Sequence, residues 1–220
     1  METPNSIEVE YTADGSSTLY IKELDEHYHS IKGAITESNH IYRDCAFVYR
    51  SNGKLLRLLE IGFGTGLNAT VTAMAANAER PIHYITLEKY PVSEELLSTL
   101  NYTDIVNKDL FMAIHAAPWG KETAITPYFT IEKRNCDYLS DELPDSIDIV
   151  YFDAFAPEKQ PEMWSREAFT RLYNILNTNA VLTTYCAKGN IRRMLSDIGF
   201  IVERIPGPPN GKREILRATK

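Results

Sequence analysis

The sequence has little of what a disulfide framework or a zinc site requires. Its 220 residues include three cysteines, which are widely spaced, form no C-x-x-C pair and have no histidine at ligand spacing. This pattern argues against disulfide bonds and against a zinc site. We therefore expect structural thiols at Cys45, Cys136 and Cys186, and no bound metal.

Long apolar segments are also missing. No run of about eighteen or more apolar residues occurs, so no membrane span is predicted. The N-terminal region is polar and acidic and has no apolar segment of the kind found in a signal peptide. These features predict a protein without a membrane anchor, located in the cytoplasm.

Basic residues are outnumbered, 23 lysines and arginines against 30 aspartates and glutamates, for a net charge of −7. Because nucleic-acid binding depends on basic surface, this balance argues mildly against an extensive nucleic-acid interface. The average hides a gradient, since residues 186–220 hold eight basic and three acidic residues, a local net charge of +5. Composition alone leaves two interpretations of this segment open. The basic residues are either distributed by chance over solvent-exposed helix faces or gathered into a basic binding surface.

Strand-like and helix-like patterns alternate along most of the chain. Seven core strands are predicted, and helical apolar spacing separates most of them. The first ends near residue 61, and the others cover 82–87, 129–133, 148–153, 181–186, 200–205 and 214–219. The turn-rich segment PGPPNGK joins the last two, which predicts an antiparallel final strand. The pattern indicates an α/β fold with a mostly parallel, Rossmann-like sheet.

The N-terminal part differs from this alternation. Residues 9–21 alternate weakly around Asp14 and Gly15, which suits a β-hairpin. Residues 26–49 are rich in tyrosine, histidine and phenylalanine and predict helical segments. We therefore expect an N-terminal extension of hairpin and helix, residues 1–50, packed on a core domain, residues 51–220.

The segment LLEIGFGTGLN, residues 58–68, combines an apolar strand with glycines at alternate positions, Gly62, Gly64 and Gly66. Glycine permits a positive φ and a close approach of backbone to ligand, and the following helix offers free N–H groups. The spacing differs from the G-x-G-x-x-G of dinucleotide enzymes. It resembles that of class I S-adenosylmethionine methyltransferases. Glu60 supports this interpretation, because a negatively charged carboxylate attracts the cationic sulfonium of S-adenosylmethionine, whereas it would repel the pyrophosphate of a dinucleotide.

Two further acids follow predicted strands. Glu88 comes directly after the second strand, where a carboxylate accepts hydrogen bonds from ribose hydroxyls in nucleotide-binding α/β folds. Asp137 follows the third strand, and in similar methyltransferases an acid there faces the adenine amino group. A solvated strand-end glutamate and an ordinary loop aspartate remain the alternatives for these two residues.

The string YFDAFAPEKQPEMW, residues 151–164, is the most specific element. Asp153 ends a buried strand, at the rim where ligands bind such sheets. Phe155 and Trp164 offer flat apolar surfaces, and the prolines stiffen the loop between them. A capping aspartate followed by a packed loop is the alternative, but the aromatic and proline content favours the wall of a site.

These segments, with the basic GNIRRML helix and the terminal GKREILRA, resemble the methyltransferase of tRNA 5-methylaminomethyl-2-thiouridine biosynthesis over residues 26–218. The resemblance implies a class I methyltransferase fold and S-adenosylmethionine as methyl donor. The acceptor would be the amine of 5-aminomethyl-(2-thio)uridine at the tRNA wobble position, with Asp153 binding the amine and taking its proton. Two departures are Ala154, where the family usually has glycine, and the PGPPNGK turn.

The resemblance also implies partners. In many bacteria this activity is fused to a flavin-dependent oxidase, for which the chain is too short, so we expect the methyltransferase form alone, with separate enzymes forming the aminomethyl group. Tyr28 is expected to form a wall over the cofactor, and Phe155 or Trp164 to stack on anticodon bases. The residues expected to contact the tRNA anticodon loop are Lys159, Lys188, Arg192, Arg193, Lys212 and Arg213.

The sequence leaves two rival functions open. An NAD-dependent oxidoreductase would explain the glycine turn and Glu88, but not the glycine spacing. A catalytically silent module that binds tRNA or a partner would keep the fold, although the retained Asp153, Glu88 and glycines argue against it.

Overall fold

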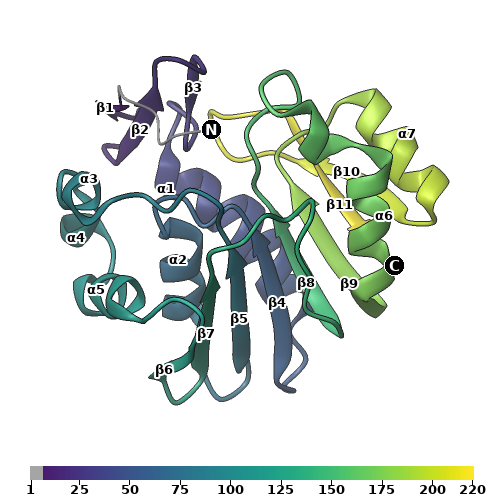
Figure 1. The fold of residues 1–220 in the computed structure, drawn as a ribbon, viewed down its shortest axis with the longest axis horizontal. Coiled ribbons are helices and arrows are strands. Elements are labelled where there is room, and N and C mark those ends of the chain that lie inside the picture. Colours follow the sequence, from purple (N-terminus) through teal and green to yellow (C-terminus); the bar gives the residue numbers. More distant parts are fainter. Residues whose placement is uncertain (1–6) are drawn as a thin grey trace.

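The structure, a computed structural model, describes residues 7–220. Its main sheet has eight strands in the order β10-β11-β9-β8-β4-β5-β7-β6 (Figure 1). The central strands are parallel, and β11 is antiparallel to both of its neighbours. The strands are β4 (Leu56–Ile61), β5 (Ile82–Leu87), β6 (Glu122–Thr126), β7 (Phe129–Arg134), β8 (Ile147–Phe152), β9 (Leu176–Thr184), β10 (Ile201–Pro206) and β11 (Glu214–Thr219).

Helices cover both faces of this sheet. Successive residues of a strand point to opposite faces, so Leu58 packs on one side and Leu59 on the other. The Leu59 face packs against α6 (Arg166–Ile175) and α7 (Gly189–Ile198). The Leu58 face packs against η1 (Ser38–Val48), α2 (Leu67–Ala75) and α5 (Lys108–Ala116). The remaining helical segments are α1 (Ala34–Glu37), α3 (Glu94–Ser98), α4 (Tyr102–Ile105) and η2 (Pro161–Trp164).

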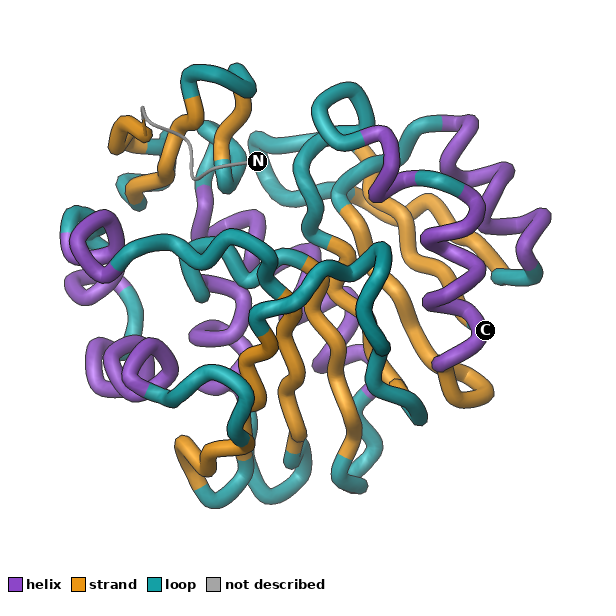
Figure 2. Tube along the Cα trace, viewed as in Figure 1, coloured by secondary structure: helices purple, strands orange, loops and turns teal. Residues whose placement is uncertain are grey.

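A small antiparallel sheet precedes the helices and is formed by β1 (Ile7–Tyr11), β2 (Ser17–Ile21) and β3 (Glu26–His27). It lies beyond the edge of the main sheet at which β4, β5 and β8 end (Figures 1 and 2). Leu19 of β2 joins Ala34, Leu67 and Val71 in one buried cluster, which ties this small sheet to α2. The first six residues of the expected extension lie outside the described residues.

The predicted α/β fold with an antiparallel final strand is confirmed, but the predicted number of strands is wrong. The eighth strand is β6, which pairs antiparallel with β7 at the edge of the sheet. Its side chains are half-buried or exposed, so its sequence has no buried apolar run to signal a core strand. The N-terminal hairpin is present, with the short β3 added to it.

The helix boundaries follow the capping residues. The Ser93 hydroxyl accepts a hydrogen bond from the Leu96 N–H, and the Ser165 hydroxyl accepts one from the Ala168 N–H. Gly199 ends α7 with a φ of 126°. No helix within residues 7–220 is both long and apolar enough to cross a membrane.

Candidate active site

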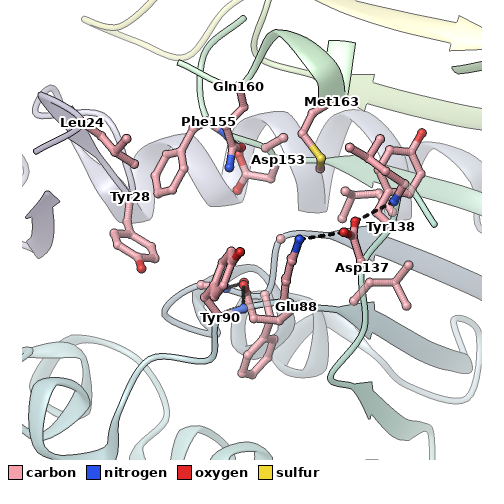
Figure 3. A pocket seen from close by; sticks show the side chains of 18 of the residues that line it. Leu24, Tyr28, Glu88, Tyr90, Asp137, Tyr138, Asp153, Phe155, Gln160 and Met163 are labelled. Carbon is pink, nitrogen blue, oxygen red and sulfur yellow. Dashed lines mark hydrogen bonds and ion pairs between the residues drawn. The ribbon is translucent and has the colours of Figure 1, made fainter. Parts of the chain in front are cut away.

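Two adjoining pockets open at the edge of the sheet where β4, β5, β7 and β8 end. The first has a volume of about 420 Å³, and Figure 3 shows its lining. The second has a volume of about 220 Å³. The two share five lining residues, Tyr28, His29, Asp153, Ala154 and Phe155. Asp153 therefore lies at the boundary between the two pockets.

The glycine loop forms one wall of the first pocket. Gly62, Gly64 and Gly66 have φ values of 91°, 51° and 71°, all in the left-handed region. A Cβ on Gly62 would lie 2.9 Å from the Asp153 carbonyl oxygen, and one on Gly64 would lie 3.0 Å from Tyr28 Cδ1. Gly66 is not part of the lining; it begins α2, and a Cβ there would lie 2.7 Å from His115 Nε2. The glycines thus permit close packing within the protein as well as an open pocket.

Glu88 lies where β5 ends and faces the first pocket. Its carboxylate accepts hydrogen bonds from the Gly64 N–H at 3.0 Å and the Tyr90 N–H at 2.9 Å. Burial raises the pKa of Glu88, and these backbone N–H groups partly offset that effect. Glu88 therefore holds the glycine loop and also presents a carboxyl group to the pocket.

Asp137 lies after β7 and lines the same pocket, on the side away from Tyr28 (Figure 3). Its carboxylate accepts hydrogen bonds from Lys89 Nζ at 2.7 Å and from the Leu139 N–H at 2.9 Å. The hydrogen bond from Lys89 holds the pKa of Asp137 below its ordinary value. Asp137, Glu88 and Asp153 thus line one pocket, as the order of strands predicted.

Asp153 is held by two side chains that the sequence analysis missed. Tyr42 donates its hydroxyl hydrogen to Asp153 Oδ1 at 2.5 Å, and Asn68 Nδ2 donates to Oδ2 at 2.8 Å. Burial, and next the nearby negative charge of Glu37, raises the pKa of Asp153 to about 7. Asn68 ends the glycine string and could have been suspected, whereas Tyr42 comes from η1 and carries no local signal.

Glu60 does not reach either pocket. It is fully buried within β4, where Thr86 Oγ1 donates a hydrogen bond to its Oε2 at 2.8 Å. Its neighbour Ile61 lines the first pocket, and alternation along the strand turns Glu60 to the opposite face. Burial raises the pKa of Glu60 to about 8. The structure therefore contradicts the expected contact between Glu60 and a bound cofactor, because the Glu60 side chain lines neither pocket.

Replacing Glu60 with glutamine should change how stability depends on pH. A carboxyl group whose pKa rises from 4.5 to about 8 on folding binds its proton more tightly in the folded state. Wild type therefore loses free energy of unfolding as pH rises from about 4.5 through 8, up to about 1.4 kcal/mol for each unit of pKa difference. Glutamine stays neutral, so thermal denaturation should show the variant gaining on wild type between acidic and mildly alkaline pH. A difference in stability between variant and wild type that stayed constant over this pH range would contradict this account.

The two aromatic residues of the string have different places. The Phe155 ring lines both pockets and packs edge-to-face on Tyr28, with ring centroids 5.2 Å apart. Tyr28 also lines both pockets, and its expected role as a wall over the cofactor stays a prediction. Trp164 is buried, and its indole N–H donates to the Phe155 carbonyl oxygen at 2.7 Å. The expected stacking of a base on Trp164 needs correction, because that ring supports the loop from inside the core.

The basic residues are spread over several elements. Lys159 pairs with Asp25 at 3.7 Å, and Lys188 pairs with Glu158. Lys212 lines the second pocket, with its Nζ 3.7 Å from the Tyr185 ring centroid. Three further basic residues lie outside both pocket linings, Arg192, Arg193 and Arg213. Of the six predicted tRNA contacts, only Lys212 lines either of these two pockets.

Comparisons with known proteins show which methyltransferases this chain is similar to. A model of the S-adenosyl-L-methionine-dependent methyltransferase family matches residues 133–220. The tRNA 5-methylaminomethyl-2-thiouridine biosynthesis bifunctional protein MnmC of Campylobacter hominis is 26% identical over 210 residues, covering 91% of this chain and 31% of that protein. MnmC of Campylobacter fetus is 28% identical over 221 residues, covering 96% of this chain and 35% of that protein. The chain thus spans about a third of the length of these curated relatives.

A solved structure matches almost the whole chain. MnmC2 from Aquifex aeolicus superposes with a TM-score of 0.76 and 25% sequence identity, over 97% of this chain and 70% of that one. Together with the fold and the glycine loop, these matches define the class of protein, an S-adenosyl-L-methionine-dependent methyltransferase. Within that class, the chain is similar to the methyltransferase part of MnmC, so the resemblance drawn from the sequence is confirmed. The oxidoreductase alternative is not favoured.

Proposed function

We propose that the protein transfers a methyl group from S-adenosylmethionine to the amine of 5-aminomethyl-(2-thio)uridine at the tRNA wobble position, forming 5-methylaminomethyl-(2-thio)uridine. The observation that carries this proposal is the place of Asp153. Its carboxyl group lies at the boundary of two pockets. The proposal assigns the first pocket to the methyl donor and the second to the acceptor amine.

The first pocket suits the methyl donor. S-adenosylmethionine supplies an activated methyl group on a cationic sulfonium. The pocket combines an open glycine loop with the carboxyl groups of Glu88 and Asp137, and these acids complement a ligand that carries hydroxyl, amino and cationic groups. In this proposal Glu88 accepts hydrogen bonds from the ribose, Asp137 accepts one from the adenine amino group, and Gly62 and Gly64 flank the methionine part.

Asp153 suits the role of base. An alkyl ammonium has no lone pair, so it must lose a proton before it can attack a methyl group. The hydrogen bonds from Tyr42 and Asn68 fix the orientation of the carboxylate, and its remaining lone pairs can accept hydrogen bonds from the amine. A pKa of about 7 lets Asp153 take up that proton near neutral pH. The rest of the rate enhancement is assigned to positioning of the two substrates.

The tRNA part of the proposal rests on the MnmC relatives and on basic side chains near the site. Lys212 belongs to the second pocket, and its neighbour Arg213 is exposed on the loop between β10 and β11. Contacts of this kind position RNA through its phosphates without reading the sequence. Separate enzymes would form the aminomethyl group, and a tRNA substrate also fits the cytoplasmic location expected from the sequence.

The direct test uses the purified protein, S-adenosylmethionine labelled in its methyl group, and two tRNA preparations. One carries the unmethylated aminomethyl nucleoside, and the other is already fully modified. We expect label in 5-methylaminomethyl-(2-thio)uridine only with the first preparation, identified by nucleoside mass spectrometry. Cofactor binding in calorimetry without any label transfer would favour the silent module, and failure to bind the cofactor would reject the proposal altogether.

A further inference from the structure

The second pocket contains a carboxylate that the sequence analysis did not identify. Glu37, the last residue of α1, is buried, and its side chain lines this pocket together with Asp153. The Ser30 N–H donates a hydrogen bond to Glu37 Oε2 at 2.8 Å, which fixes the side chain. The other oxygen, Oε1, has no hydrogen-bond donor among residues 7–220. One acceptor oxygen of a fixed carboxylate is thus available to a ligand.

The charge of the second pocket favours a cation. Its acidic lining residues are Glu26, Glu37 and Asp153, and the lysine that faces them is Lys212. The Lys212 ammonium is held over the Tyr185 ring and is not within ion-pair distance of Glu37 or Asp153 in the described part of the chain. His29 adds no positive charge near neutral pH, because burial lowers its pKa to about 4. The positive charge of Lys212 therefore offsets only part of the negative charge of these acidic residues.

The negative charge of Glu37 acts on Asp153 electrostatically. The charge of Glu37 is the second largest cause of the raised pKa of Asp153, after burial. Keeping two carboxyl groups close together in a partly buried pocket costs free energy unless a cation enters between them. An ammonium group meets that requirement, since it has three donors and no acceptor.

We propose that Glu37 is the residue that recognises the acceptor amine in its ammonium form, and that the second pocket is the acceptor subsite. This inference rests on the proposed function. Glu37 Oε1 accepts a hydrogen bond from the ammonium, while Asp153 accepts a second and then takes the proton. The neutral amine that remains keeps its hydrogen bond to Glu37 and faces the first pocket with its lone pair. Removing the charge of Glu37 should therefore weaken binding of the acceptor more than binding of the methyl donor.

The test compares wild type with Glu37→Gln, which keeps an oxygen for the Ser30 N–H and is nearly the same size. Binding is measured for two tRNAs that differ only in whether the wobble uridine carries the aminomethyl group. We expect wild type to prefer the aminomethyl tRNA and the variant to lose most of that preference, roughly a tenfold loss or more, as for a hydrogen bond to a charged group. The KM for the acceptor should rise by a similar factor, with little change in the affinity for S-adenosylmethionine.

Glu95→Gln makes the same chemical change on the exposed side of α3 and should behave as wild type. If Glu37→Gln kept the full preference for the aminomethyl tRNA, the inference would be overturned while the proposed function stood. If wild type itself neither preferred nor methylated the aminomethyl tRNA, the proposed function and this inference would fall together. Thermal denaturation of the variant separates loss of recognition from loss of folding.

Discussion

Replacing Asp153 with asparagine should lower the rate of methyl transfer by roughly 10²- to 10⁴-fold, the usual contribution of a general base. Asparagine has almost the same shape, so the side chain can still accept a hydrogen bond from Tyr42. It cannot take up a proton from the acceptor ammonium. Because Glu88, Asp137 and the glycine loop are unchanged, we expect the affinity for S-adenosylmethionine to stay near that of wild type.

The measurement pairs label transfer to aminomethyl tRNA with calorimetric titration of the cofactor. Asp145→Asn is a matched control, because Asp145 is exposed and precedes β8, whereas Asp153 follows it. The control should retain full activity. A large loss of cofactor affinity in Asp153→Asn, or turnover close to wild type, would be incompatible with the role assigned to Asp153.

Replacing Glu88 with alanine should weaken binding of S-adenosylmethionine by roughly 100-fold or more. In the proposed mode the carboxylate accepts hydrogen bonds from the ribose, and bonds to a charged group contribute about 1.5 to 3 kcal/mol each. The change also leaves the Gly64 and Tyr90 N–H groups without their acceptor, which loosens the loop beside the ligand. Both effects act on the donor pocket and leave the residues of the second pocket in place.

Calorimetric titration gives the dissociation constant, and methyl transfer at saturating cofactor tests whether turnover recovers. Glu79→Ala is the control, since Glu79 is exposed and lies before β5, whereas Glu88 follows that strand. We expect the control to bind as wild type. An unchanged dissociation constant for Glu88→Ala would mean that the cofactor does not contact this carboxylate.

The positions of several residues of the candidate site could be predicted because they follow from local rules. The three glycines have the positive φ values that their alternate spacing suggested. Glu88, Asp137 and Asp153 line one pocket because the ends of parallel strands meet at one edge of the sheet. Both rules depend on short segments of sequence, so they can be applied without knowing how distant parts of the chain pack.

Other features depend on which distant segments meet. Tyr42 contacts Asp153 across 111 residues of sequence, a pairing that no local pattern carries. Trp164 and Phe155 have similar chemistry in one loop, yet one ring is in the core and the other lines both pockets. The edge strand β6 also had no apolar signal, because it pairs through its backbone and buries little.

By itself, the sequence determined the α/β alternation, the antiparallel final strand, the glycine turn and the acids at the strand ends, because these depend on residue type and short-range spacing. Only the tertiary structure decided that Glu60 faces away from the pocket and that Glu37 faces into one. The physical reason is that a carboxyl group has the same chemistry in either place. Its role depends on the face of the strand or helix that carries it and on the partners that packing brings to it.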